Sequence, residues 1–344
     1  MKEFVHLHLH TEFSLLDGAC RIDELLDEAQ RLKMPALAVT EHGNMFSSVV
    51  FHDAARKRGI NPILGCEVYV APGDRRDKSG TPGETANHLV LLAENEKGFK
   101  NLIKLVSSGY TEGFYYKPRI DKQLLAQHAE GLIGLSSCLK GEVASEIRGE
   151  QAKKAIAAAA QYQDILGKGN FFLEMQYQGI DEQRIVNNGL LPIARDLGMP
   201  LVATNDVHYL RHGDHKPHDI LLCIGTGKSV NDSNRLKYHG DQFFLKSAAE
   251  MADVFGDYPD AMKNTLLIAE RCNVTIPSGQ NHLPNFAVPE GYTVDSYFEH
   301  VTRQGYAQRL ERLRQLDADG KLRHTLAVYD ERLTYEIAMI KKMG

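Results

Sequence analysis

Residues 4–11 read FVHLHLHT, an alternation of apolar residues and histidines that is typical of a β-strand. Alternate side chains of a strand lie on one face, so His6, His8 and His10 are expected to project into the same space. Burying three imidazoles together is costly unless each finds a partner. The run is therefore either a polar, partly exposed strand edge or part of a metal site, and we favour the metal site.

Short apolar runs alternate with amphipathic segments from Phe4 to Asp206, a pattern typical of βα units around a parallel sheet. The runs are continuous rather than alternating, as expected for strands buried on both faces. The predicted strands begin at Phe4, Ala36, Ile63, Leu89, Leu132, Phe171 and Leu201. The sequence thus predicts an α/β fold with a closed or doubly covered sheet.

One connection lacks a crossover helix. Residues 71–87 have no helical periodicity and carry five turn-forming residues, Pro72, Gly73, Gly80, Pro82 and Gly83. Parallel neighbours need a long crossover, so we expect the strand that begins near His88 to run antiparallel to the strand that carries Glu67.

Helical patterns predominate after Tyr209. They cover Asp219 to Cys223, Ser247 to Phe255, Asp260 to Cys272, Val294 to Leu316 and Leu326 to Met343. The predicted domains are a strand-containing part (1–212), an appended helical segment (213–273), a Pro-containing linker (274–292) and a helical part (293–344).

Composition limits the class of protein. With 344 residues, 43% of them hydrophobic and 25% charged, the chain is in the globular range. The five cysteines show no CxxC spacing, which argues against a disulfide framework and for a reducing compartment. No apolar stretch approaches the ~18 residues that a membrane span needs, and we expect a cytoplasmic protein. The net charge of −5 gives no global attraction for nucleic acid, so DNA binding should be weak and need a local basic patch.

Further candidate metal ligands follow the later strands. They are Asp17, His42, Glu67, Cys138, Asp206 and His208. Sites in barrels and open α/β sheets form at the carboxyl ends of strands, where distant loops converge. His88 precedes its strand and would join this end only if that strand is antiparallel.

These motifs resemble the PHP (polymerase and histidinol phosphatase) superfamily, and most closely the PHP domains in the alpha subunits of bacterial replicative DNA polymerases. The resemblance rests on FVHLHLHTEFSLLDGAC, ALAVTEHGNMF, PILGCEVYV, NHLVLLAEN, GFYYKPRID, LSSCLKGEV, PLVATNDVHYL and AERCNV, which are spread over the chain. It implies a distorted (β/α)7 barrel over 1–212, with appended helices and a C-terminal helical extension that begins the polymerase region. It also implies that the sequence is part of a larger protein.

The resemblance further implies a centre of three metals. The first would be held by His8, His10, Glu67 and Asp206, the second by Glu67, His88 and Cys138, and the third by Asp17, His42 and His208. Imidazole suits zinc and iron, carboxylate suits manganese, and thiolate favours zinc, so we expect zinc, with manganese or iron as alternatives. Asp206, His208 and Glu67 would take part in catalysis. His6 is outside the nine and either orients a ligand or is a plain barrel-interior residue.

Two other motifs resemble ligand-binding sequences. GTGKS (225–229) lacks the spacing of a phosphate-binding loop. In GFYYKPRID, aromatic residues lie beside Lys117 and Arg119, which suits weak binding of single-stranded DNA, or equally a core-anchored loop with solvated charges.

The function that these features favour is a metal-dependent phosphodiesterase, a 3′–5′ exonuclease that proofreads during DNA replication. The chain lacks the Asp-rich nucleotidyl-transfer motif, so we expect no polymerase activity from it. Its expected partners are a DNA 3′ end, the remainder of the alpha subunit and other replisome subunits, with no membrane. Two alternatives stay open: a metal-stabilised structural or docking domain without catalysis, and a small-molecule phosphatase of the histidinol-phosphatase type.

Overall fold

The computed structural model describes residues 3–81, 86–280 and 284–343. The chain divides into two units, Met1–Ile276 and Pro277–Gly344. All strands found among the described residues lie in the first unit. The predicted linker, 274–292, spans the boundary between the units, and its residues 281–283 lie outside the described residues.

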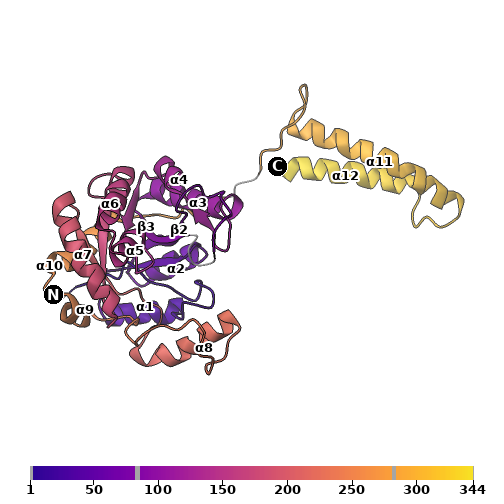
Figure 1. The fold of residues 1–344 in the computed structure, drawn as a ribbon. Helices are drawn as coiled ribbons and strands as arrows, with labels where there is room; N and C mark the ends of the chain where they lie inside the picture. Colours follow the sequence, from indigo (N-terminus) through magenta and orange to yellow (C-terminus); the bar gives the residue numbers. More distant parts are fainter. Residues whose placement is uncertain (1–2, 82–85, 281–283, 344) are drawn as a thin grey trace. The chain divides into compact units, whose positions relative to one another are not determined.

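A curved sheet forms the centre of the first unit (Figure 1). Its strands are β1 (Ala36–His42), β2 (Asn61–Val70), β3 (Asn87–Ala93), β4 (Arg119–Ile120), β5 (Leu132–Leu135), β6 (Phe171–Gln176) and β7 (Leu201–Thr204). They pair in the order β1-β2-β3-β5-β6-β7, and β4 pairs with β2. Six of the seven predicted strands are confirmed to within two residues at their starts. The two-residue β4 is too short to leave a sequence pattern.

The remaining predicted strand, which begins at Phe4, is an extended segment rather than a regular strand. It lies between β1 and the residues after β7, because Ala38 N donates to His6 O (3.0 Å) and Val207 N donates to His8 O (3.1 Å). The ladder is irregular because the Thr40 side chain takes the Leu9 N–H, with a distance of 2.9 Å from Leu9 N to Thr40 Oγ1. The segment nonetheless joins the two ends of the sheet and closes a distorted barrel.

The reversed strand is confirmed. β3 runs antiparallel to both β2 and β5, whereas the β1–β2, β5–β6 and β6–β7 pairs are parallel. In this register His88 lies opposite Tyr69, near the carboxyl end of β2. Pro82 and Gly83 of the predicted loop lie outside the described residues.

Amphipathic helices surround the sheet. They are α1 (Ile22–Arg31), α2 (Ser48–Lys57), α3 (Glu96–Thr111), α4 (Lys122–Gln127), α5 (Glu142–Arg148), α6 (Ala152–Leu166), α7 (Asp181–Leu197), α9 (Ala248–Phe255) and α10 (Pro259–Arg271). In α1 the helical spacing of Ile22, Leu25, Leu26 and Ala29 puts one apolar face against the core, where all four are buried.

Helix α10 closes the amino-terminal end of the barrel. Asn61, the first residue of β2, donates from Nδ2 to the carbonyls of Ala269 (3.3 Å) and Cys272 (2.9 Å). Asn264 donates to the carbonyl of Leu201, the first residue of β7, at 2.7 Å. The carboxyl end of the barrel is therefore the end left for a site.

A short helical turn, η1 (His212–Asp214), and α8 (His215–Thr226) follow the barrel. Residues 227–246 then return to it, and His208 N donates to Phe243 O at 2.8 Å. This return brings Tyr238 to the open end.

The second unit contains α11 (Val294–Ala318) and α12 (Leu326–Met343), close to the predicted bounds. Thr293 caps α11 by accepting a hydrogen bond from Ser296 N, and Lys341 pairs with Glu299 across the two helices at 2.5 Å. No helix in the described part of the chain is long and apolar enough to span a membrane.

Candidate metal centre

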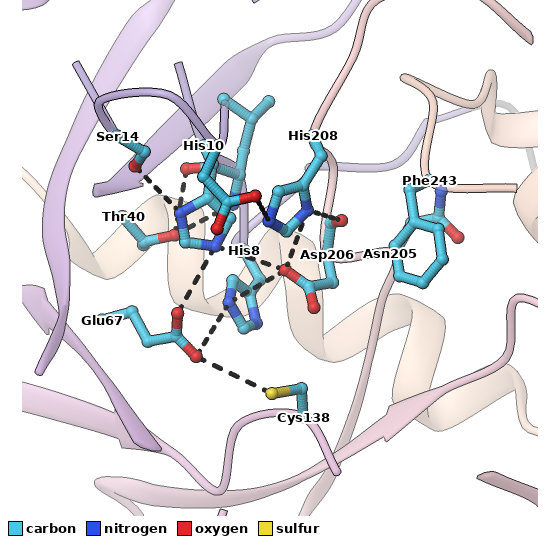
Figure 2. A network of polar contacts seen from close by, with 12 residues as sticks. His8, His10, Ser14, Thr40, Glu67, Cys138, Asn205, Asp206, His208 and Phe243 are labelled. Carbon is cyan, nitrogen blue, oxygen red and sulfur yellow. Dashed lines mark hydrogen bonds and ion pairs between the residues drawn. The ribbon is translucent and has the colours of Figure 1, made fainter. Parts of the chain in front are cut away.

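The structure brings the nine predicted ligands together at the open end of the barrel. Figure 2 shows His8, His10 and His208 directed toward Glu67, Cys138 and Asp206. Three groups of these side chains place their potential ligand atoms within 4.8 Å of one another. The groups are His8, His10 and Asp206; Glu67, His88 and Cys138; and His10, His42 and His208.

The first group surrounds one point. His8 Nε2 lies 3.3 Å from Asp206 Oδ1 and 3.6 Å from Glu67 Oε1. His10 Nε2 lies 3.3 Å from the same Asp206 oxygen and 3.5 Å from Glu67 Oε2. Two atoms that each lie about 2.1 Å from one tetrahedral ion are about 3.4 Å apart. These four side chains are therefore spaced as ligands of a shared cation.

The second group adds a thiol. Glu67 Oε1 lies 2.7 Å from His88 Nδ1 and 3.8 Å from Cys138 Sγ, and that sulfur lies 3.8 Å from His88 Nδ1. Burial and the Glu67 carboxylate raise the pKa of the Cys138 thiol, so the thiol keeps its proton until a cation displaces it. Glu67 faces both groups: its Oε1 lies near His8, His88 and Cys138, and its Oε2 lies near His10.

The third group, His10, His42 and His208, shares His10 with the first group, and Asp17 faces it. His42 Nε2 is 3.0 Å from Asp17 Oδ2, and His208 Nε2 is 3.9 Å from Asp17 Oδ1. The Tyr238 hydroxyl lies 2.8 Å from His208 Nε2 and 3.2 Å from Asp17 Oδ1. Tyr238 thus contacts two of the three side chains that the resemblance assigns to the third metal.

The ligand set fits a metal on an independent observation. Five nitrogen and oxygen atoms of these side chains are buried and make no well-aligned hydrogen bond: His8 Nε2, His10 Nε2, His42 Nδ1, His42 Nε2 and Asp206 Oδ1. The two His42 nitrogens nevertheless lie within 3.0 Å of the Glu67 and Asp17 carboxylates as ion pairs. Leaving a buried polar atom unsatisfied costs about 1–3 kcal/mol. Cations bound among them would satisfy all five, and the mixture of imidazole, carboxylate and thiolate suits transition metals such as zinc.

Glu174 orients His8. Its Oε1 lies 2.7 Å from His8 Nδ1, which leaves Nε2 directed at the other ligands. Glu174 is itself fixed by Ser137 N (2.9 Å) and by the Thr204 hydroxyl (2.5 Å). A carboxylate behind a ligating histidine is the usual arrangement at metal sites. Glu174 was not predicted as a site residue, because it lies inside the apolar run FFLEMQ of β6.

Glu41 anchors the loop beside His10. The Ser14 hydroxyl donates to Glu41 Oε2 at 2.5 Å and lies 3.2 Å from His10 Nδ1. Glu41 also accepts from Thr11 N at 3.0 Å. The buried carboxylate therefore fixes both the backbone and the ring orientation next to the first group.

Without a cation, electrostatics favour the ligand-competent state of the three carboxylates and of His10, whereas for His8 and His42 the facing carboxylates outweigh burial and raise the pKa. Burial raises the pKa values of Asp17, Glu67 and Asp206, but the facing histidines outweigh it and hold all three well below the usual range. Burial and the neighbouring His42 and His208 lower the pKa of His10 to about 3. Burial also lowers the pKa of His42, yet the Glu67 and Asp17 carboxylates outweigh this effect and raise it to about 10. Without a cation, His42 therefore supplies the positive charge between these carboxylates.

A family model described as the PHP domain matches residues 6–178, half of the chain. The chain belongs to the PHP domain family. The matched residues include seven of the nine predicted ligands, and Asp206 and His208 follow them in sequence.

Curated relatives extend the similarity beyond the PHP domain. The chain is 46% identical over 308 residues to DNA polymerase III subunit alpha of Treponema pallidum, a match that covers 89% of this chain and 26% of that protein. It is 40% identical over 346 residues to the same subunit of Borreliella burgdorferi, covering 99% and 29%. The chain thus spans less than a third of the length of these relatives.

A solved structure is also similar. A two-domain protein from Bacteroides vulgatus, described as containing a PHP-like metal-dependent phosphoesterase, is 14% identical with a TM-score of 0.36. The match covers 81% of this chain and 72% of that one.

The cluster of candidate ligands opens into a cavity of about 350 Å³. Asp17, His42, Glu67, His88, Cys138, Asp206 and His208 reach its wall, whereas His8 and His10 are fully buried behind it. Lys117, Lys140 and Lys237 stand at the same cavity and are exposed. Cationic side chains therefore adjoin the cluster of ligands.

The prediction that Arg119 binds DNA is wrong. Its side chain is 2% exposed, and it donates to the carbonyls of Gly113 (3.1 Å), Arg75 (2.9 Å) and Asp77 (2.6 Å). Arg119 thus holds the GFYYKPRID turn against the loop before it. Lys117, two residues earlier, is exposed and reaches the cavity, so only this member of the predicted pair is placed to meet a ligand.

His6 lies apart from the centre. Its Nε2 is 2.8 Å from the carbonyl of Lys246, and its ring packs edge-on against Phe4. Burial lowers the pKa of His6 to about 4, so the ring is neutral. Within the described residues, no polar contact joins His6 to the nine ligands, which fits the barrel-interior interpretation rather than a role in orienting a ligand.

Proposed function

We propose that this PHP domain is a metal-dependent phosphodiesterase that removes nucleotides from DNA 3′ ends, a proofreading 3′–5′ exonuclease of a cytoplasmic replicative polymerase. The observation that carries the proposal is the set of buried ligand atoms without well-aligned hydrogen bonds, gathered at and directly behind the wall of one cavity. A purely structural metal is usually enclosed by four ligands, whereas this centre faces a cavity large enough for a substrate.

The choice of substrate rests on the relatives and on the cavity. The relatives are named as DNA polymerase III alpha subunits, whose work leaves a DNA 3′ end. Three lysines stand at the cavity, and cations there suit a phosphodiester backbone.

The protein's own residues would divide the work. Glu67 and Asp206, with His8 and His10, would hold a cation, and Cys138 with His88 would hold its neighbour; zinc is our first choice, with manganese or iron as alternatives. Bound metals lower the pKa of a coordinated water and neutralise phosphodiester charge. Glu67 would serve both sites, because its carboxylate faces His10 on one side and His88 on the other.

Tyr238 would contribute a hydrogen-bond donor. Burial and nearby carboxylates raise the pKa of Tyr238 well above its usual value, so the hydroxyl keeps its proton. The hydroxyl lies at His208 and Asp17, at the wall of the cavity. From there it would hold His208 in place or donate to a bound phosphate oxygen.

The test is a comparison of end labels on single-stranded DNA, with the bound metals measured in the same preparation. A 3′–5′ exonuclease releases a 3′ label at once as a mononucleotide, while a 5′ label is retained in a ladder of shortening products. Metal-loaded protein that leaves both labels intact would refute the activity and leave the structural or docking role. Turnover of histidinol phosphate without turnover of DNA would favour the small-molecule phosphatase.

A further inference from the structure

A second cavity, also of about 350 Å³, adjoins the metal centre. The two cavities share Asp17, His42, Tyr69, Lys117 and Leu236 in their walls. Because two of the shared residues are predicted metal ligands, a molecule in the second cavity would lie directly against the metal centre. Its volume is in the range of small-molecule sites, about 300–1,000 Å³.

The walls of the second cavity are largely apolar and aromatic. Phe46, between β1 and α2, is 60% exposed, and Tyr110, near the end of α3, is 43% exposed. Tyr69 lies between the cavities, with its ring edge-on to His88 (centroids 5.1 Å apart) and Lys117 Nζ 5.3 Å from its centroid. Exposed aromatic rings beside a metal centre offer stacking surfaces that the barrel core does not use.

Backbone geometry brings this wall together. Gly43, directly after His42, has φ +62°, and a Cβ built there would lie 2.9 Å from both Pro118 Cγ and Tyr69 Cε2. Only glycine permits this approach without displacing Tyr69 or Pro118. The TEHGN motif therefore places a ligand and, one residue later, makes room for the aromatic wall.

Charge distinguishes a nucleotide from an apolar peptide as the occupant. Lys117 belongs to both cavities, and Lys140 and Lys237 stand around the metal side. None of the three forms an ion pair with an acidic side chain in the described ranges. A ligand with an aromatic body at one end and an anionic group at the metals would use both features.

We propose that the second cavity holds the base of an unpaired 3′-terminal nucleotide, packed against both Phe46 and Tyr110, so that the adjoining phosphodiester lies at the metal centre. This inference rests on the proposed function and adds that the second cavity selects which DNA ends are degraded. Every base has an aromatic face, so stacking tolerates any sequence. A base that is still paired and stacked in duplex DNA cannot enter, so the cavity would favour frayed or mispaired ends.

The direct test uses an oligothymidylate that carries 2-aminopurine as its last base and a phosphorothioate at its last linkage, so that it binds without being degraded. Stacking should quench 2-aminopurine fluorescence, and the same probe placed five bases from the end should respond much less. Phe46→Ala and Tyr110→Ala should each weaken binding of the terminal probe by about 5-fold or more.

The matched control is Ile103→Ala. Ile103 lies on the same helix as Tyr110, has the same exposed fraction of 43%, and lines neither cavity, so its variant should bind like the parent. If Phe46→Ala and Tyr110→Ala both bind the terminal probe as tightly as the parent does, the inference is overturned.

A second substrate separates this inference from the proposed function. Bis(p-nitrophenyl) phosphate tests phosphodiester chemistry without a nucleobase. Phe46→Ala and Tyr110→Ala should keep the parent's rate on it while losing the preference for unpaired over paired 3′ ends. A metal-loaded parent that hydrolyses neither this ester nor DNA defeats the proposed function, whereas equal end preference in parent and variants defeats only the base-binding cavity.

Discussion

The two ends of the barrel are built on opposite principles. At the amino end, Asn61 and Asn264 donate their side-chain N–H groups to carbonyls of neighbouring segments, and α10 covers the core. At the carboxyl end, His8, His10 and Asp206 together keep three buried atoms without a hydrogen bond, whereas at the amino end Asn61 keeps one, its Oδ1. One end thus contributes to stability, and the other holds polar groups that are unfavourable until a cation arrives.

The backbone shows the same contrast. Four of the six non-glycine residues with positive φ in the described chain belong to loops at the open end: Leu16 (61°), Tyr116 (58°), Ser137 (66°) and Asp206 (48°). Such conformations cost of order 1 kcal/mol each and persist where surrounding contacts enforce them. For Ser137 and Asp206 the enforced turn directs a site residue, or the neighbour that fixes one, into the cluster.

The largest expected effect comes from removing the metals. Chelation should abolish DNA degradation and lower the melting temperature of the first unit, because it restores unsatisfied atoms at the open end. A ligand present at 1,000 times its Kd stabilises the folded state by about 4 kcal/mol, which corresponds to a shift of roughly 8–16 °C. Calorimetry with and without chelator measures the shift. An unchanged melting temperature, with metal loss verified by elemental analysis, would contradict a metal-filled centre.

Asp206→Asn should give the next largest effect. The amide keeps the size of the side chain but removes the charge at the oxygen nearest His8 and His10, so DNA degradation should fall by at least about 100-fold. The fold should survive, because the other ligands and the core remain. Initial rates on 3′-labelled DNA measure the loss.

The control for this variant is Asp241→Asn, the same chemical change at an aspartate that pairs with His212 outside the nine ligands. It should keep the parent's rate. Parent-level degradation by Asp206→Asn would remove Asp206 from the site, while loss of folding without any parental nuclease activity would leave the metals a structural role.

A smaller effect is expected at Glu174, which touches a ligand but is not one of the nine. Glu174→Gln loses the charge that holds His8 Nδ1 and should weaken metal binding by about 10- to 100-fold. Titration of metal-free protein by calorimetry gives the affinities. Equal affinity in parent and variant would show that His8 is oriented without Glu174.

The convergence of the nine side chains at the open end could be predicted from the sequence, because each side chain belongs to a short motif next to a strand end. HLHLHT, TEHGN, SSC and TNDVH each place a ligand type beside a strand end, and the missing crossover helix predicted the reversal that brings His88 to Glu67. The order and direction of the strands bring these motifs to one end of the barrel, and the nine side chains converge there.

Residues whose role depends on long-range packing escaped prediction. Tyr238 reaches His208 from an irregular segment 30 residues later that has no periodicity. Arg119 was predicted to be a surface cation, because a sequence pattern does not reveal the backbone carbonyls that accept its hydrogen bonds. His6 repeats the spacing of His8 and His10 but sits beside Lys246, so an identical pattern leads to a different environment.

The smallest effect is expected at the closed end, where a change should reduce stability without touching chemistry. Asn61→Ala removes two hydrogen bonds to carbonyls in and just after the last turn of α10 and should lower the free energy of unfolding by about 1–3 kcal/mol. Metal affinity and the rate per folded molecule should stay at the parent's values, because Asn61 begins β2 and Glu67 lies near its other end. Denaturant unfolding measures the change in stability, and DNA degradation by the same preparation measures the rate per folded molecule. A variant of unchanged stability but reduced activity would show that the two ends are coupled through β2 rather than independent.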